Sequence, residues 1–302
     1  MGNTALRRRL PAFVAGLASL VMASGLAAIP AEAASSKVDY VALGDSYTAG
    51  TGAGPFDFGY PCDKTPGGYV DVVGKTGRVN LLDNAACHGA FLTLDPLSPV
   101  LHDLRIPNVE QQISSLAGSS LTPESELVSI TAGANDVGVT GVLLTCLTQP
   151  AQDCTAAIQA SAALFPSMQT HFMSVLHQIH TAAPNARIAV LGYPRLFNPT
   201  TPFGQADPSL LYSINTAVDG LNTAIEGAVA ASGTGAVFIN VSGGFVGHEV
   251  NSADSWIFFS PPTVSPSGPV FDPRNFHPNK EGHRAYASAL LEAVKPSQLV
   301  TR

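Results

Sequence analysis

Five short apolar runs along the chain have the composition of β-strands. They are rich in valine, isoleucine, leucine and alanine, and turn-forming residues such as glycine, asparagine, aspartate and proline follow most of them. Runs of this length with little polar alternation indicate strands buried in a sheet. The predicted strands are 38–43, 79–82, 127–131, 187–191 and 237–241.

Apolar residues at helical spacing fill much of the sequence between these runs. Helices are predicted at 109–116, in a long region from Cys154 through Ile179, at 210–229 and at 280–294. Pro166 marks a break or a helix start within the long region. Strands that alternate with helices predict an α/β fold, a mostly parallel sheet with helices on both faces.

The first 33 residues have the features of a secretory signal peptide. Three arginines at 7–9 precede an apolar segment at 10–29, and Ala31-Glu32-Ala33 resembles a cleavage site. A retained membrane anchor is the alternative, because the apolar segment is nearly long enough to span a bilayer. Pro11 and the small residues favour cleavage. We therefore expect a protein that is secreted to the extracellular space.

Residues 34–302 are predicted to form one domain. Removing the signal peptide leaves 269 of 302 residues, ample for one large α/β domain and short for two. The net charge of the whole chain is −7, and it becomes −9 without Arg7–Arg9 and Glu32. An acidic surface of this kind argues against binding to nucleic acid.

Four cysteines, Cys62, Cys87, Cys146 and Cys154, lie in this predicted domain. Disulfides persist outside the cell, and four cysteines allow three pairings. Cys146 and Cys154 enclose a short loop and are the expected partners, which leaves Cys62 to pair with Cys87. A zinc site is the weaker interpretation, because no pair has C-x-x-C spacing.

The stretch 38–54 is the first candidate for chemistry. A strand breaks at Gly44 and leads into Asp45, Ser46 and Tyr47, followed by three glycines. A sharp turn after a strand can present a nucleophilic hydroxyl at the carboxyl edge of a sheet. The simpler interpretation of Ser46 is a helix N-cap. Asp45, adjacent on an extended segment, points away and is expected to brace the turn by hydrogen bonds.

Three further segments are predicted to gather at the same edge of the sheet, at Gly89, Asn135 and His277. Acyl transfer requires a nucleophile, a base and donors for the oxyanion. Ser46 can attack and His277 can accept its proton. The backbone N–H groups of Ser46 and Gly89 and the Asn135 side-chain amide can donate to the oxyanion. No cofactor and no metal is expected.

Four ordered blocks of sequence resemble the SGNH (GDSL) hydrolase superfamily, in its secreted actinobacterial lipase/esterase branch. The blocks are GDSY at 44–47, CHGA at 87–90, GAND at 133–136 and HPN at 277–279. The resemblance implies a three-layer sandwich with a flavodoxin-like sheet of five parallel strands, and a serine esterase that uses no metal. It assigns Ser46 as nucleophile, His277 as base, and Gly89 and Asn135 as oxyanion donors.

The sequence departs from this family at the third member of the triad. Many members carry an aspartate three positions before the catalytic histidine, and here that position is Arg274. In some members of the secreted branch a backbone carbonyl at this position orients the histidine instead, so the resemblance implies a Ser46–His277 dyad in which the backbone carbonyl of Arg274 binds the imidazole. Asp272 is the rival third member.

Two further histidines lie near these blocks. His88 stands beside the oxyanion glycine, where a small residue is common in the family. It is interpreted as a polar loop residue held near Cys87, with contact to the leaving group as the alternative. His283, inside the last predicted helix, is interpreted as structural.

The sequence therefore predicts a secreted serine esterase or lipase acting on small-molecule or lipid esters. The alternatives are a polysaccharide deacetylase of the same fold and a non-catalytic extracellular binding protein. The apolar segment from Leu92 to Leu101 either borders a pocket, which favours lipid-like acyl chains, or covers the core. The loops 91–106, 195–208 and 243–275 are expected to set the depth of the pocket. We expect a monomer with at most transient contact with lipid surfaces.

Overall fold

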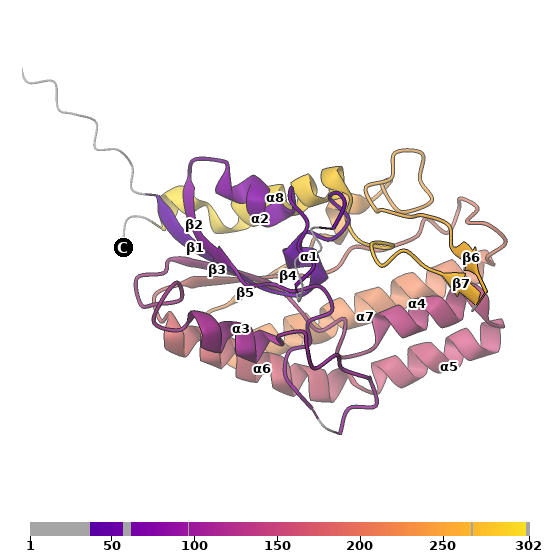
Figure 1. Ribbon diagram of the computed structural model, residues 1–302, viewed down its shortest axis with the longest axis horizontal. Coiled ribbons are helices and arrows are strands. Elements are labelled where there is room, and N and C mark those ends of the chain that lie inside the picture. The colour runs from indigo at the N-terminus through magenta and orange to yellow at the C-terminus, as the bar shows by residue number, and fades with distance from the viewer. Residues whose placement is uncertain (1–36, 57–61, 96, 267, 300–302) are drawn as a thin grey trace, which may run out of the picture. The chain divides into compact units, whose positions relative to one another are not determined.

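A parallel sheet of five strands in the order β2-β1-β3-β4-β5 forms the centre of the computed structural model (Figure 1). This is the flavodoxin-like order, so the predicted sheet is confirmed. The structure describes residues 37–56, 62–95, 97–266 and 268–299. The strands are β1 Val38–Gly44, β2 Val79–Asn84, β3 Leu127–Thr131, β4 Arg187–Leu191 and β5 Val237–Ile239.

Helices cover both faces of this sheet, as the α/β prediction requires (Figure 1). One face carries α2 Tyr69–Gly74 and α8 Lys280–Val294, which pack against each other. The opposite face carries α3 Val109–Leu116, α6 Phe165–Ala182 and α7 Pro208–Ser232. The result is the predicted three-layer sandwich.

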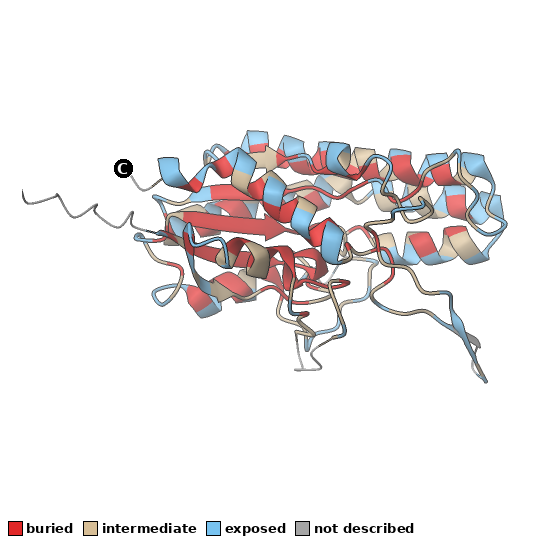
Figure 2. Cartoon of the chain, turned by 90° about the horizontal axis from the view of Figure 1, so that it is seen from above, coloured by how far each residue is buried: buried red, intermediate tan, exposed pale blue. Residues whose placement is uncertain are grey.

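The core lies in the sheet and in the inner faces of these helices. All five residues of β3 are buried, and Figure 2 shows the strands as the buried interior. A parallel strand covered on both faces has no solvent side, so the polar Ser129 and Thr131 of β3 are buried together with its apolar residues.

Capping residues and a proline mark the starts of several predicted helices. Asn108 caps α3 through a capping box with Gln111, and Asn279 caps α8 by accepting from the N–H groups of Glu281 and Gly282. Pro166 lies in the first turn of α6, so it starts a helix. The long region after Cys154 is therefore two helices, α5 Ala151–Ala162 and α6.

The structure contains elements that the sequence patterns did not indicate. These are the helices α1 Ser46–Ala49, α2 and α4 Val139–Thr148. The first two have only four and six residues, and α4 begins after Gly138 at φ 68° with no side-chain cap. The segment 243–275, predicted as a long loop, begins within a 3-10 helix, Ser242–Phe245, and later holds a hairpin of β6 Thr263–Ser265 and β7 Gly268–Val270. A second 3-10 helix, Pro296–Gln298, follows α8.

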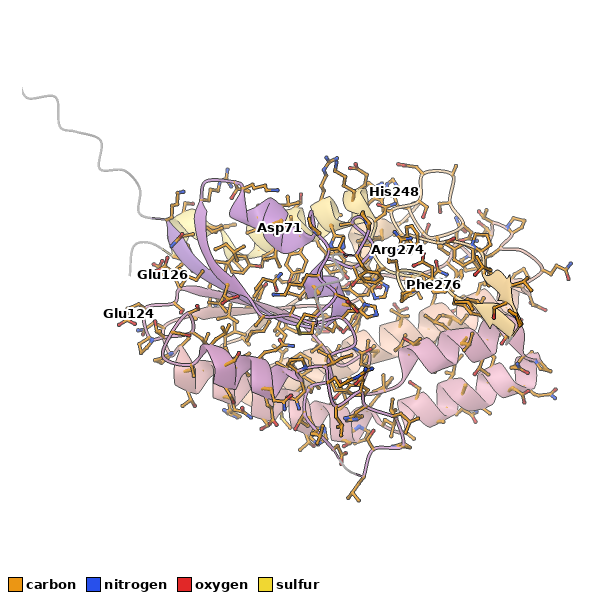
Figure 3. All side chains as sticks on the ribbon, in the orientation of Figure 1. Asp71, Glu124, Glu126, His248, Arg274 and Phe276 are labelled. Atoms are coloured by element: carbon orange, nitrogen blue, oxygen red, sulfur yellow. A yellow bond between two sulfur atoms is a disulfide. The ribbon has the colours of Figure 1, made fainter. Side chains whose placement is uncertain are left out.

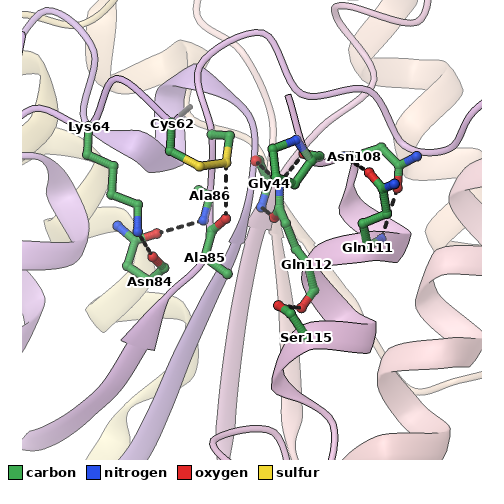
Figure 4. Close-up of a disulfide and its surroundings, with 12 residues drawn as sticks. Gly44, Cys62, Lys64, Asn84, Ala85, Ala86, Asn108, Gln111, Gln112 and Ser115 are labelled. Carbon is green, nitrogen blue, oxygen red and sulfur yellow. Dashed lines mark hydrogen bonds between the residues drawn. A yellow bond between two sulfur atoms is a disulfide. The ribbon is translucent and has the colours of Figure 1, made fainter. Parts of the chain in front are cut away.

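The two expected disulfides are present. Cys62 is joined to Cys87 (Figure 4), and Cys146, at the end of α4, is joined to Cys154 in α5. The first bridge fixes the segment after β2, and the second holds α4 and α5 together.

The backbone contacts divide the chain into Met1–Ser35 and Ser36–Arg302, and the elements above all belong to the second part. The predicted signal peptide, residues 1–33, lies outside the described residues. Among the residues that are described, no helix combines the length and apolar character needed to cross a membrane.

Candidate active site

Ser46 is the first residue of helix α1, immediately after β1. Gly44 adopts φ 127°, and a Cβ there would overlap the carbonyl oxygen of Thr131, so the turn requires glycine. Asp45 has extended backbone angles and caps α1 by accepting from the N–H of Tyr47 at 3.0 Å. The N-cap is therefore Asp45, and the interpretation of Ser46 as the cap is wrong.

Asp45 also ties three strand ends together. Its carboxylate accepts from Thr131 Oγ1 at 2.6 Å and from Tyr193 Oη at 2.5 Å, at the ends of β3 and β4. Burial raises the pKa of Asp45 to about 6, and its hydrogen bonds limit that rise. The expectation that Asp45 braces the turn is confirmed, because its carboxylate accepts from Tyr47, Thr131 and Tyr193 around it.

The hydroxyl of Ser46 meets the imidazole of His277. Ser46 Oγ lies 2.7 Å from His277 Nε2. On the other side of the ring, Nδ1 lies 3.2 Å from the carbonyl oxygen of Arg274 and 3.0 Å from that of Asn275. A carbonyl can only accept, so the proton of the neutral ring resides on Nδ1 and Nε2 accepts from Ser46.

The loop before α8 holds His277 in this position. Phe276 adopts the left-handed region, φ 65°, and its carbonyl accepts from Tyr47 Oη at 2.7 Å. The N–H of Phe258 donates to the carbonyl of His277 at 2.8 Å. At Gly52, φ 94°, a Cβ would overlap the carbonyl oxygen of Pro278, so the loop after α1 packs directly against the histidine loop.

Asp272 is engaged elsewhere. Its carboxylate accepts from Arg274 Nη2 at 2.6 Å, from Nε at 2.9 Å and from the Arg274 backbone N–H at 2.9 Å. Figure 3 shows Arg274 beside Phe276 in the segment that leads from the β6–β7 hairpin toward α8. The Arg274 guanidinium lowers the pKa of Asp272. The rival carboxylate is thus paired with the side chain of Arg274, while the carbonyl of Arg274 faces His277.

The three residues that carry the candidate oxyanion donors, Ser46, Gly89 and Asn135, line one cavity together with His277. In the first turn of α1, the N–H of Tyr47 is bound to Asp45 and that of Thr48 to Thr131 Oγ1. The N–H of Ser46 has no acceptor within the helix. Gly89 adopts φ 78°, and Asn135 Nδ2 donates to the carbonyl of Ala90 at 2.8 Å, which orients the amide and leaves its second hydrogen for a ligand.

His277 is uncharged over a wide pH range. Burial, and to a smaller extent the nearby His88, lower its pKa to about 3, against the opposing effect of the two carbonyls. An imidazole that remains neutral can accept the serine proton.

The two remaining histidines differ in their surroundings. His283 accepts from the N–H of Tyr69 through Nδ1 at 3.2 Å and donates from Nε2 to the carbonyl of Thr51 at 3.0 Å. Both of its nitrogens are occupied, in agreement with a structural role. His88 lies beside the site, with its ring centroid 5.5 Å from that of His277, and it lines the same cavity.

The cavity has a volume of about 800 Å³ and is walled mainly by helices. From the nucleophile it extends between α4, α5 and α7. Its apolar lining includes Val142, Leu143, Leu147, Ile158, Phe165, Ile214, Ala217, Val218 and Leu221.

Two of the three loops expected to set the depth of the pocket contribute to its lining: 195–208 through Leu196, and 243–275 through Phe271, Asp272, Pro273 and Asn275. Of the described residues in 91–106, none lines the cavity, so of the two alternatives for the Leu92–Leu101 segment the structure favours the one in which it covers the core. Leu92 is buried in the core, whereas Leu97 and Leu101 are 90% and 95% exposed. Sequence reasoning missed that α4 and α5 form part of the cavity wall. The apolar sequence of α4 and the Cys146–Cys154 pair were the signals that could have indicated it.

Comparison with known proteins places these features in a family. Residues 42–285 match the GDSL-like lipase/acylhydrolase family. Lipase 1 of Streptomyces coelicolor is 34% identical over 249 residues, which cover 80% of this chain and 85% of that protein. A lipase of Streptomyces rimosus is 30% identical over 299 residues, which cover 95% of this chain and all of that protein.

Solved structures agree with the sequence relatives. The phospholipase A1 of Streptomyces albidoflavus superposes with a TM-score of 0.69 at 30% identity, covering 85% of this chain and 99% of that one. The extracellular lipase of Streptomyces rimosus gives a TM-score of 0.67 at 26% identity, covering 85% and 100%. The resemblance stated from four short blocks is confirmed: the chain belongs to the GDSL-like lipase/acylhydrolase family and is a carboxylic-ester hydrolase.

Proposed function

We propose that the protein hydrolyses esters through an acyl-enzyme on Ser46, with His277 as the base. The distance of 2.7 Å between Ser46 Oγ and His277 Nε2 carries this proposal. Ser46 attacks the ester carbonyl while its proton passes to Nε2. The protonated imidazole then returns this proton to the departing alcohol. Water, deprotonated by His277, attacks the acyl-enzyme and releases the acid.

The negative charge that develops on the carbonyl oxygen is held by three donors. These are the N–H groups of Ser46 and Gly89 and the free hydrogen of the Asn135 amide. One such donor typically contributes about 3 kcal/mol to lowering the barrier. The free N–H of Ser46 at the start of α1 and the fixed Asn135 amide support this assignment.

His277 acts in a dyad rather than a triad. The carbonyl oxygens of Arg274 and Asn275 fix the tautomer by accepting from Nδ1, and Asp272 has no part in catalysis. Two carbonyl dipoles stabilise the imidazolium less than a carboxylate does, so the base relies on orientation more than on charge. The pairing of Asp272 with Arg274 supports this view.

The substrate is an ester with a medium or long acyl chain. The helical cavity is mainly apolar, and its volume of about 800 Å³ far exceeds the space required by an acetyl group. This favours a lipase or long-chain esterase over a polysaccharide deacetylase. The names of the relatives, lipases and a phospholipase A1, agree with that preference.

The protein acts outside the cell, after removal of residues 1–33 from the single catalytic domain at 34–302. The N-terminal sequence pattern and the extracellular Streptomyces rimosus relative support this location. Mass spectrometry of the protein recovered from culture medium tests it, with an N-terminus at residue 34 as the expected result.

A series of p-nitrophenyl esters from acetyl to hexadecanoyl tests the function. We expect kcat/KM to rise with chain length up to the capacity of the cavity, and Ser46→Ala to abolish turnover of every member. Activity restricted to acetyl esters would favour the deacetylase. Turnover unaffected by Ser46→Ala would contradict the mechanism.

A further inference from the structure

The two sides of the ester bond face different surroundings in this site. The acyl side has an apolar cavity between α4, α5 and α7. The alcohol side must remain near His277, which returns a proton to it. Most polar side chains nearby are engaged: Asp45 with three donors, Asp272 with Arg274, and Asn135 with Ala90. His88 is a polar side chain at the cavity to which the mechanism gives no task.

The ring of His88 is held in a fixed position. Its backbone follows the Cys62–Cys87 disulfide, and its N–H donates to the carbonyl of Cys62 at 3.2 Å. Its Nδ1 lies 3.1 Å from Oγ1 of Thr51, which is fully buried. With one ring nitrogen bound to the protein interior and the ring lining the cavity, Nε2 is the nitrogen left to meet a ligand.

The chemistry of this nitrogen suits a hydroxyl group. Burial lowers the pKa of His88, so the ring is neutral near pH 7. Thr51 can donate to Nδ1 or accept from it, so Nε2 is a donor in one tautomer and an acceptor in the other. A hydroxyl both donates and accepts, and it therefore pairs with either tautomer. An alkyl group pairs with neither.

We propose that His88 binds the alcohol side of the ester and selects alcohols that carry a further hydroxyl group, as partial glycerides do. This inference rests on the proposed function, because it presumes that the acyl chain occupies the helical cavity. It adds a specificity-determining residue that acts on the leaving group. A hydrogen bond between the substrate hydroxyl and Nε2 holds the departing oxygen near His277.

Two esters with the same acyl group test the proposal. The first is 1-butanoylglycerol and the second is propyl butanoate, which has the same three-carbon alcohol without its two free hydroxyls. The variant is His88→Leu, which keeps a side chain of similar bulk and removes the nitrogens. His177→Leu, a change at an exposed histidine of α6, is the matched control.

We expect His88→Leu to lower kcat/KM for 1-butanoylglycerol about tenfold, the effect of one neutral hydrogen bond, and to leave propyl butanoate within about twofold. His177→Leu should leave both esters unchanged. An equal loss on both esters, or no loss on either, overturns the proposal. Where His88→Leu does not fold, His88→Ala carries the same comparison. Turnover of propyl butanoate that depends on Ser46 tests the proposed function separately.

Discussion

The carboxylate of Asp272 binds the guanidinium of Arg274 at 2.6 Å, two residues away, and not the imidazole of His277. Arg274, which stands where many relatives have an aspartate, therefore has two roles in the site. Its side chain holds the only nearby rival carboxylate among the described residues of this loop, and its carbonyl accepts from His277 Nδ1.

Asp272→Asn should consequently change activity little. The substitution removes a partly exposed ion pair but leaves both carbonyl acceptors of His277 in place, so we expect kcat to fall less than about fivefold. Asp219→Asn, which removes the comparable Arg195–Asp219 pair, is the control. A loss of several hundredfold in Asp272→Asn with the fold intact would restore the triad.

The acid limb of kcat/KM should lie well below pH 6.5. His277 must be neutral to accept the serine proton, and its pKa is lowered to about 3, so protonation inactivates it only at low pH. A pH profile with a short-chain ester measures this, provided that circular dichroism shows the protein folded throughout. An acid limb at or above pH 6.5 would show that the buried environment does not lower this pKa.

The two disulfides should affect different substrates. Removing either one costs about 3 kcal/mol of unfolding free energy. Replacing Cys62 and Cys87 by serine should also lower kcat for short esters, because this bridge anchors the segment of Gly89. Replacing Cys146 and Cys154 should affect long acyl chains more than short ones, because that bridge joins α4 to α5 in the cavity wall. Equal effects of both pairs across the ester series would refute this division.

A bulky residue in the helical cavity should shorten the accepted acyl chain. Ala217 lies on α7 and lines the cavity, and Ala217→Phe is expected to lower kcat/KM for hexadecanoyl esters at least tenfold while sparing acetyl esters. Ala230→Phe, at an exposed position of the same helix, is the control. The same loss for acetyl and hexadecanoyl esters would place the acyl chain elsewhere.

Strong local signals made much of the fold predictable. The buried strands β3 and β4 and the helices α3 and α8 coincide with their predicted ranges, because their apolar runs are bounded by turns or by capping asparagines. The four-residue α1 has too few positions for a periodic pattern. The cavity between α4, α5 and α7 depends on the packing of α5 against α7, which lies far along the chain, and residue spacing does not encode that contact.

Part of the candidate site could likewise be predicted from the sequence, and part could not. Four short blocks were enough to propose Ser46, Gly89, Asn135 and His277, since the carboxyl ends of parallel strands meet at one edge. The second carbonyl at His277, that of Asn275, could not be foreseen. A loop in which Phe276 adopts a positive φ brings this carbonyl to Nδ1. A phenylalanine in the sequence does not indicate a positive φ.

The most direct test of the central claim is covalent labelling of the purified protein by a serine-directed alkyl phosphonate, located by peptide mass spectrometry. We expect one equivalent to attach to Ser46, none to attach to Ser46→Ala, and the rate to fall at least a thousandfold in His277→Ala. Labelling at another residue, or a rate that does not depend on His277, would contradict the account.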